Sequence, residues 1–160
     1  SRAAFSGGMR SALRRFGLLA FRDGMEDGGY SPESLSQDDL IIFRAWQAES
    51  SDYVSNIDVS LFKNGQTPDP AARSELWVNK SLDDIYYAGL RIGAPNKLAV
   101  WKLGATEKHC GMCADRHDEI RAIDEWGKVG FPRDRCLDCG GWQCDCDLFD
   151  VKTGQRIGAR

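Results

Sequence analysis

The sequence predicts a mainly α-helical fold, in which about three helices are followed by a small cysteine-rich, zinc-stapled β-hairpin module. Three observations predict this fold. Apolar residues recur at helical spacing from Met9 to Leu90. After Pro95 a short alternation with frequent glycine replaces that pattern, and all six cysteines lie in this last part of the chain. We therefore expect a helical region over residues 1–95 and a cysteine-rich module over residues 96–160.

The first expected helix runs from Met9 to Arg22. Its apolar side chains recur at steps of three and four, so they share one face. They are Met9, Leu13, Phe16, Leu19 and Ala20. Asp23-Gly24 is expected to end the helix, because glycine readily takes the backbone conformation that follows a last helical turn.

The second expected helix begins after Ser36, because Asp39 three residues later resembles a capping box. Its apolar stripe consists of Leu40, Phe43, Trp46, Tyr53, Val54, Ile57 and Leu61. Ser50-Ser51 could allow a break in this helix. Asn64-Gly65 supplies a left-handed stop.

The third expected helix opens at Asp69-Pro70, because aspartate is a good N-cap and proline suits the first helical position. Its buried stripe consists of Leu76, Leu82, Ile85, Tyr86 and Leu90. Gly93 and Pro95 end it.

A short strand is expected next, because apolar and other residues alternate with a period of two. The alternating sets are Leu98, Val100 and Leu103 against Ala99, Lys102 and Gly104.

The composition is that of a globular chain: its 160 residues with 42% hydrophobic content are enough for one hydrophobic core and a small second hydrophobic cluster. No apolar run approaches the roughly 20 residues that cross a bilayer, and the first residues lack the apolar stretch of a secretory signal. We therefore expect no membrane contact and a chain made in the cytoplasm. Because the chain begins with Ser1 rather than Met, the sequence leaves open whether a leader was removed before it.

The formal charge of -3 argues against a protein whose main task is to grip nucleic acid, since neutralising phosphates needs surplus Lys and Arg. The opening stretch is nevertheless basic and precedes an acidic patch. Its arginines are Arg2, Arg10, Arg14, Arg15 and Arg22. They form either a solvated helix face or a stretch that contacts DNA or an acidic partner.

The cysteines predict a metal site that holds the C-terminal third together. A Cys-x-x-Cys turn points two thiolates at one spot, and a second close pair completes the tetrahedral sulfur shell that zinc prefers. The expected ligands are Cys110, Cys113, Cys144 and Cys146, with Cys139 as the substitute.

Disulfides remain the alternative to zinc. Cys144 and Cys146 stand only one residue apart, so a bond between them would be strained, and the expected compartment favours metal. Cys136 is not among the expected ligands, and His109 and His117 also stay outside the expected ligand shell.

No enzyme motif gains support. A thiol redox site needs a βαβ framework around its Cys-x-x-Cys, and a zinc deaminase needs a His-x-Glu segment that is missing before Cys110. The carboxylates near His117 are interspersed with arginines, as in a solvated loop, and no nucleophile has a paired base. We therefore expect no catalytic residues and no enzymatic activity.

A tryptophan, a Thr-x-x-x-Cys-x-x-Cys segment and a closing Cys-Gly-Gly-x-x-Cys-x-Cys motif follow one another in this region. Here they are Trp101, Thr106, Cys110, Cys113, Cys139, Gly140, Gly141, Cys144 and Cys146. In spacing and order, residues 101–148 resemble the C-terminal region of phage head morphogenesis proteins, the minor head proteins of the phage Mu F-like class.

The resemblance implies a structural minor capsid protein of a tailed bacteriophage. Such a protein is present in low copy in the virion, is assembled in the host cytoplasm and acts near the portal in head assembly, genome retention or delivery. Its expected partners are portal and capsid proteins, with DNA contact through the basic N-terminal stretch left open. The alternative is a zinc-dependent nucleic-acid-binding module.

Four residues of the module either contact a partner or cover the metal site. They are Trp126, Phe131, Pro132 and Trp142. Aromatic side chains serve both roles, so the sequence leaves this choice open.

Overall fold

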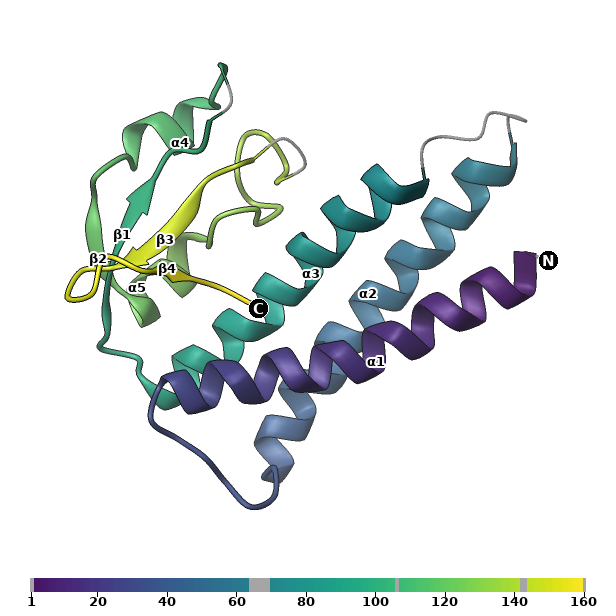
Figure 1. Ribbon diagram of the computed structural model, residues 1–160, viewed down its shortest axis with the longest axis horizontal. Helices are drawn as coiled ribbons and strands as arrows, with labels where there is room; N and C mark the ends of the chain where they lie inside the picture. The colour runs from purple at the N-terminus through teal and green to yellow at the C-terminus, as the bar shows by residue number, and fades with distance from the viewer. Residues whose placement is uncertain (1, 64–69, 106, 142–143, 160) are drawn as a thin grey trace.

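The computed structural model describes residues 2–63, 70–105, 107–141 and 144–159, with the side chains of 2–5, 57–63 and 70–79 left undescribed. Three long helices come first: α1 (Arg2–Asp27), α2 (Gln37–Lys63) and α3 (Pro70–Gly93). A small sheet with two short helices follows them, beside the second half of α3 (Figure 1). The predicted fold class, mainly α with a small cysteine-rich β module, is confirmed.

Helix α1 packs closely along α3 because each contributes a glycine to the contact. A methyl group at Gly24 would overlap the carbonyl oxygen of Tyr86, and one at Gly89 would overlap that of Phe21. Gly24 therefore lies inside α1, which continues to Asp27, and the prediction that Asp23-Gly24 ends the helix was wrong. The close contact with α3 explains the glycine, which needs no helix stop there.

The buried face of α1 also differs from the predicted one. Leu13 and Ala20 are buried as expected, but Phe16 is 50% exposed and Leu19 is 51% exposed. Phe21 and Met25 are fully buried instead. The glycines turn the face that carries Phe21 and Met25 toward α3, which leaves Phe16 and Leu19 on the outside.

Helix α2 begins with the predicted capping box. The Ser36 backbone N–H donates to Asp39 Oδ2 at 2.9 Å, and the Asp39 N–H donates to Ser36 Oγ at 3.1 Å. The helix passes through Ser50 and Ser51 without a break. Its core side chains include Phe43, Trp46 and Val54. The side chains of Ile57 and Leu61, and the Asn64-Gly65 stop, lie outside the described residues.

Helix α3 begins at Pro70, as predicted, and ends at Gly93. Ile85, Tyr86 and Leu90 are buried. Asp69 and the Leu76 side chain lie outside the described residues. Because both α1 and the module pack on α3, this helix is the central support of the molecule.

The module contains more than the predicted hairpin. Its elements are β1 (Leu98–Lys102), α4 (Gly111–Asp115), β2 (Ile120–Ala122), α5 (Ile123–Val129), β3 (Asp147–Asp150) and β4 (Arg156–Ile157). The strands form one antiparallel sheet in the order β2-β1-β3-β4. Strand β1 therefore lies in the interior of the sheet.

Strand β1 has the predicted position but buries the face opposite to Leu98 and Val100, and Leu103 lies just beyond the strand. Leu98 is 51% exposed, whereas Ala99 and Trp101 are fully buried. Trp101 packs against Trp126 with 5.3 Å between ring centroids. The large indole ring at position 101 buries more apolar surface than Leu98 would, so it selects the face that turns inward.

Three of the four module residues considered for partner contact, Trp126, Phe131 and Pro132, are core residues. Trp126 is fully buried and donates from Nε1 to the Ala99 carbonyl at 3.0 Å. Phe131 stacks on Tyr87 of α3 with 4.5 Å between centroids, and Pro132 is also buried. Partner contact through these three residues is therefore excluded as their main role, while Trp142 lies outside the described residues.

A buried charge cluster ties α3 to the module. Asp83 accepts hydrogen bonds from Arg133 and Arg156 and from the Ala159 N–H, each at 2.8 Å. Asp147 accepts from the same two guanidinium groups at 3.0 Å. The cluster joins α3 to β3 and β4, while the division at residues 95 and 96 into two domains stays a prediction. Among the described residues, no helix is long and apolar enough to cross a membrane.

Candidate metal centre

The first two candidate ligands stand at the start of α4. Cys110 is the residue before the helix, with an extended backbone, and Cys113 lies in the first turn and is buried. This arrangement brings both thiols to the same end of α4, as the Cys-x-x-Cys spacing predicts.

Sheet pairing brings the last two cysteines to this point. Strand β3 begins directly after Cys146, and its first residue, Asp147, pairs with Lys102 at the end of β1. The chain beyond β1 then packs on the cysteine segment: a methyl group at Gly104 would overlap the Asp145 carbonyl oxygen. The end of β1 therefore fixes Cys144 and Cys146 beside α4.

Cys139 reaches the cluster from the loop between α5 and β3. The loop turns at Gly140 and Gly141, which have φ angles of 61° and 77°, a region that favours glycine. Lys80 of α3 donates to the Gly140 carbonyl at 3.1 Å, and the Met112 N–H donates to Asp138 at 3.3 Å. These two contacts hold the loop against both α3 and α4.

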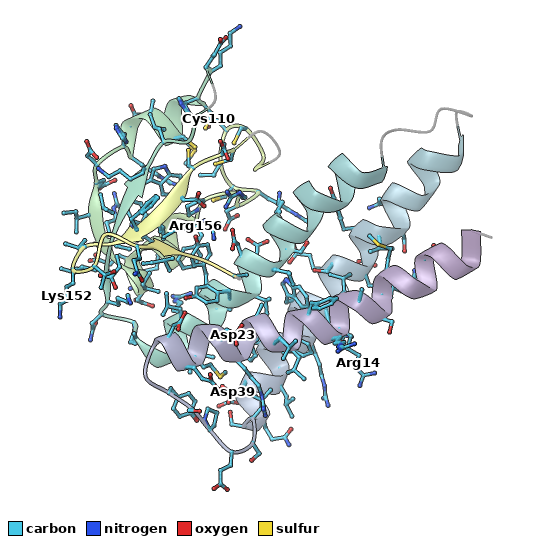
Figure 2. All side chains as sticks on the ribbon, in the orientation of Figure 1. Arg14, Asp23, Asp39, Cys110, Lys152 and Arg156 are labelled. Atoms are coloured by element: carbon cyan, nitrogen blue, oxygen red, sulfur yellow. The ribbon has the colours of Figure 1, made fainter. Side chains whose placement is uncertain are left out.

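Five cysteine sulfur atoms therefore converge in two overlapping groups of three. One group is Cys110, Cys113 and Cys139, and the other is Cys113, Cys144 and Cys146. Within each group all sulfur atoms lie within 4.8 Å of one another, and Cys113 belongs to both. Figure 2 shows the yellow sulfur atoms gathered near Cys110.

Within each group of three, the spacing fits thiolates that share one metal ion. Four ligands at about 2.3 Å from a tetrahedral zinc stand about 3.8 Å apart. The Cys113 and Cys144 sulfur atoms are 3.7 Å apart. A [4Fe–4S] cluster fits less well, because each of its thiolates binds a different iron and the cluster atoms hold the thiolates further apart.

The thiols differ in how readily they lose their protons. Burial raises the pKa of Cys113 well above its ordinary value, and the hydrogen bond with Cys146 together with burial does the same for Cys144. The Cys144 hydrogen bond lowers the pKa of Cys146. Burial opposes ionisation of Cys110, but hydrogen bonds from Cys113 outweigh it and lower the pKa. A metal ion would have to displace protons from the buried thiols, so its affinity should fall with falling pH.

The remaining predicted candidates lie apart from both groups. Cys136 is exposed, and its thiol is 3.5 Å from the Val129 carbonyl oxygen. His117 is exposed, and its Nδ1 accepts from the Leu103 N–H at 3.4 Å. Among the described residues, neither group includes a histidine or a carboxylate. The five cysteines that the sequence singled out are therefore the ones that converge in the structure.

Sequence reasoning missed the burial of Arg116, the residue that follows α4. Arg116 donates to the carbonyl oxygens of Val129 at 2.8 Å and Gly130 at 3.3 Å. Its guanidinium group also lies 5.2 Å from the centre of the Trp101 ring. The sequence showed only an arginine within an acidic stretch, which is typical of a solvated loop.

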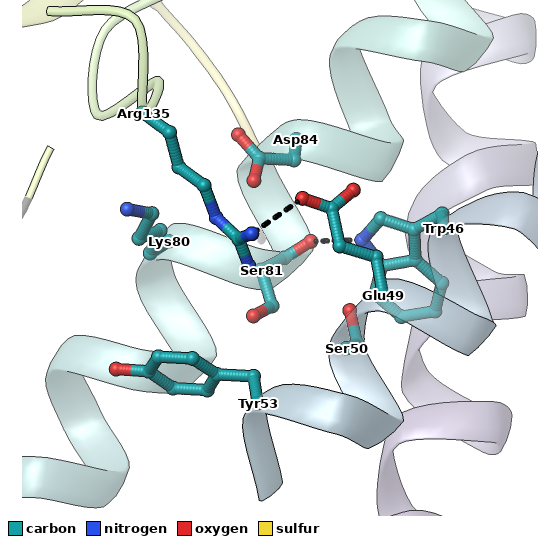
Figure 3. A pocket seen from close by; sticks show the side chains of 8 residues that line it. All are labelled: Trp46, Glu49, Ser50, Tyr53, Lys80, Ser81, Asp84 and Arg135. Atoms are coloured by element: carbon teal, nitrogen blue, oxygen red, sulfur yellow. Dashed lines mark hydrogen bonds and ion pairs between the residues drawn. The ribbon is translucent and has the colours of Figure 1, made fainter. Parts of the chain in front are cut away.

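A small hollow lies between α2, α3 and the loop that carries Cys139 (Figure 3). Its volume is about 20 Å³, which is room for roughly one water molecule. Arg135 reaches across it to Glu49 at 3.0 Å, and the Trp46 indole donates to the Ser81 carbonyl at 2.9 Å. Burial, followed by the neighbouring Asp134, raises the pKa of Asp84 to about 8. This hollow is too small for a substrate.

Comparisons of this chain with family models, with curated proteins and with solved structures find no match. The chemistry of the chain's own residues therefore has to support any functional conclusion.

Proposed function

We propose that the chain is a structural minor head protein of a tailed bacteriophage virion. It acts near the portal in head assembly, genome retention or delivery, and its partners are portal and capsid proteins. One zinc ion holds its C-terminal module in shape. The proposal assigns it no catalytic residue.

One observation carries the metal-stapled part of this proposal: the cysteines of the head-protein motif converge in space. Cys110 and Cys113 are separated in sequence from Cys144 by about thirty residues, yet both groups of sulfur atoms have ligand spacing. A motif with this convergence is expected of a metal-stapled module. The phage assignment itself is supported by the resemblance over residues 101–148.

A structural role also agrees with the character of the cluster. Structural zinc sites are closed by four protein ligands, whereas catalytic sites keep one position for water. Each group supplies three sulfur atoms, and the groups meet at Cys113, so a small movement of one cysteine from the neighbouring group would complete a shell of four without solvent. Cys113 takes part in any such shell, with Cys110, Cys144 and Cys146 as the other proposed ligands and Cys139 as the substitute.

The proposed role in the virion is tested by asking whether purified virions contain the protein. Mass spectrometry of purified virions from the phage that encodes this chain should detect it in a few copies relative to the major capsid protein. A phage in which the coding sequence is deleted should produce tails but fail to yield filled, infectious heads. Absence of the protein from virions, together with normal heads in the deletion, would contradict the proposal.

A further inference from the structure

An open groove of about 330 Å³ lies between α1 and α2, away from the cysteine module. It is lined by Arg10, Leu13, Arg44, Gln47, Ala48 and Ser51. The buried Leu13 and the small Ala48 give it an apolar part, and both of its charged residues are arginines. The groove is therefore suited to an apolar side chain that is accompanied by a carboxylate.

The arginines are held close to the groove. Arg10 of α1 donates to the Ser55 hydroxyl of α2 at 2.8 Å, which keeps its guanidinium group across the space between the helices. On a chain with a net charge of -3, this groove is locally positive. An acidic partner segment would be attracted to it.

Helix α2 itself carries an apolar side chain with a carboxylate of this kind. Ile41 is 63% exposed, and Asp38 lies one turn before it and is exposed as well. Ile41, Arg44, Ala48 and Ser51 follow at steps of three and four, so they share one stripe of α2. Ile41 and Ala48 lie two turns apart, or about 10 Å along the helix axis.

We propose that this stripe of α2 is the contact between two copies of the chain. A twofold axis near Arg44, perpendicular to α2, reverses the direction of the second helix and places the two Arg44 side chains side by side, so the two Asp38–Arg10 approaches have to offset their repulsion. Ile41 of each copy then enters the groove of the other beside Ala48, and Asp38 approaches Arg10. Because the projecting residue and the groove lie on the same stripe, each copy gives and receives the same contact, as an isologous interface requires.

The contact gains stability from two sources. Two isoleucine side chains leave water, and two carboxylates approach guanidinium groups at the rim. The inference does not depend on zinc or on the phage role, because the cysteine groups lie elsewhere in the molecule.

Adjacent residues provide a matched pair of variants for the test. Ile41→Asp places a charge in the proposed contact, whereas Ile42→Asp makes the same change about 100° further round the helix, at a site 39% exposed. Sedimentation equilibrium of the full zinc-loaded chain, from low micromolar to near-millimolar concentration, measures the dimer dissociation constant. Ile41→Asp should raise it by roughly tenfold or more, and Ile42→Asp should leave it within about twofold.

A charge exchange tests the orientation of the two copies. Asp38→Arg and Arg10→Asp should each weaken the dimer, and the double variant should recover a large part of the loss. Circular dichroism melts confirm that every variant remains folded. A wild-type chain that stays monomeric across the concentration range would overturn the proposal and leave the groove to a different acidic partner. Equal effects of the Ile41 and Ile42 variants, or no recovery in the double variant, would overturn it too.

Discussion

Cys113 is the residue on which the proposed metal centre depends most. It is buried, it belongs to both groups of sulfur atoms, and its thiol is the one measured at 3.7 Å from Cys144. Each other clustered cysteine belongs to only one group, so a neighbour can replace it in the shell.

We predict that Cys113→Ser abolishes zinc binding and lowers the melting temperature by about 10 °C or more, because the module loses the free energy of metal binding. Cys136→Ser is the matched control, since this exposed thiol lies outside both groups. Its zinc content and melting temperature should equal those of the wild type. Retained zinc in Cys113→Ser, measured by elemental analysis, would disprove the assignment.

Asp84 should make stability depend on pH. Its pKa is raised to about 8 by burial and then by Asp134, so the folded chain holds a proton that the unfolded chain releases near its ordinary pKa of about 3.8. The folded state therefore binds more protons between these values. The contribution of this group is complete below about pH 4 and is lost as the pH rises toward 8.

Asp84→Asn removes the cost of ionising this half-buried carboxyl. From pKa values of about 3.8 unfolded and about 8 folded, we expect the wild type to lose up to about 1.4 kcal/mol of stability per pH unit relative to the variant, at most about 4 kcal/mol between pH 5 and pH 8. Urea unfolding at several pH values measures it. The same change at the exposed Asp52 should have little effect, and a wild-type-like pH dependence in Asp84→Asn would refute the expectation.

At the scale of elements, the contact between α1 and α3 depends on glycine. A methyl group at Gly24 would overlap the Tyr86 carbonyl oxygen in the backbone of α3. A backbone atom can move only if the whole helix shifts, so the contact cannot relax locally.

Gly24→Ala should therefore destabilise the chain by about 2–3 kcal/mol, despite the higher helix propensity of alanine. Gly7→Ala lies in the same helix, where the added methyl group meets nothing within 4 Å. That control should stabilise the chain by about 0.5–1 kcal/mol. Chemical unfolding of both variants gives the comparison, and a neutral or stabilising Gly24→Ala would show that the helices do not approach this closely.

The elements also show which structural signals were readable in the sequence. The starts of α2 and α3 were predicted correctly, because a capping box and a proline at the first helical position act within one turn. The end of α1 and the buried face of β1 were not. Both are decided by distant partners, the backbone of α3 for Gly24 and Trp126 for Trp101.

The candidate site also has residues that the sequence predicts and residues that it does not. The five clustered cysteines could be selected from their spacing, because a Cys-x-x-Cys turn and a close second pair have a local geometry. The burial of Arg116 could not be predicted, since its partners are carbonyl oxygens more than ten residues away and its neighbours in sequence are polar. The choice of four ligands among five depends on tertiary distances that no spacing encodes.

At the scale of the whole molecule, net charge distinguishes the proposed minor head protein from the alternative, a nucleic-acid-binding module. Helix α1 exposes arginines, but the chain as a whole carries a charge of -3. A module that grips phosphates loses affinity steeply as salt rises, because bound counterions are released. We predict that duplex DNA binds the zinc-loaded chain only weakly at physiological salt, as measured by fluorescence anisotropy. Tight binding with a steep salt dependence that Arg14→Glu reduces would favour the alternative.

The central claim is that a single zinc ion holds the cysteine module together. Elemental analysis of the chain purified under reducing, chelator-free conditions, combined with a count of reactive thiols, tests it most directly. We predict about one zinc per chain and few reactive thiols, with the exposed Cys136 among them. A metal-free chain with all six thiols reactive, or one without metal and without free thiols because disulfides have formed, would contradict the claim.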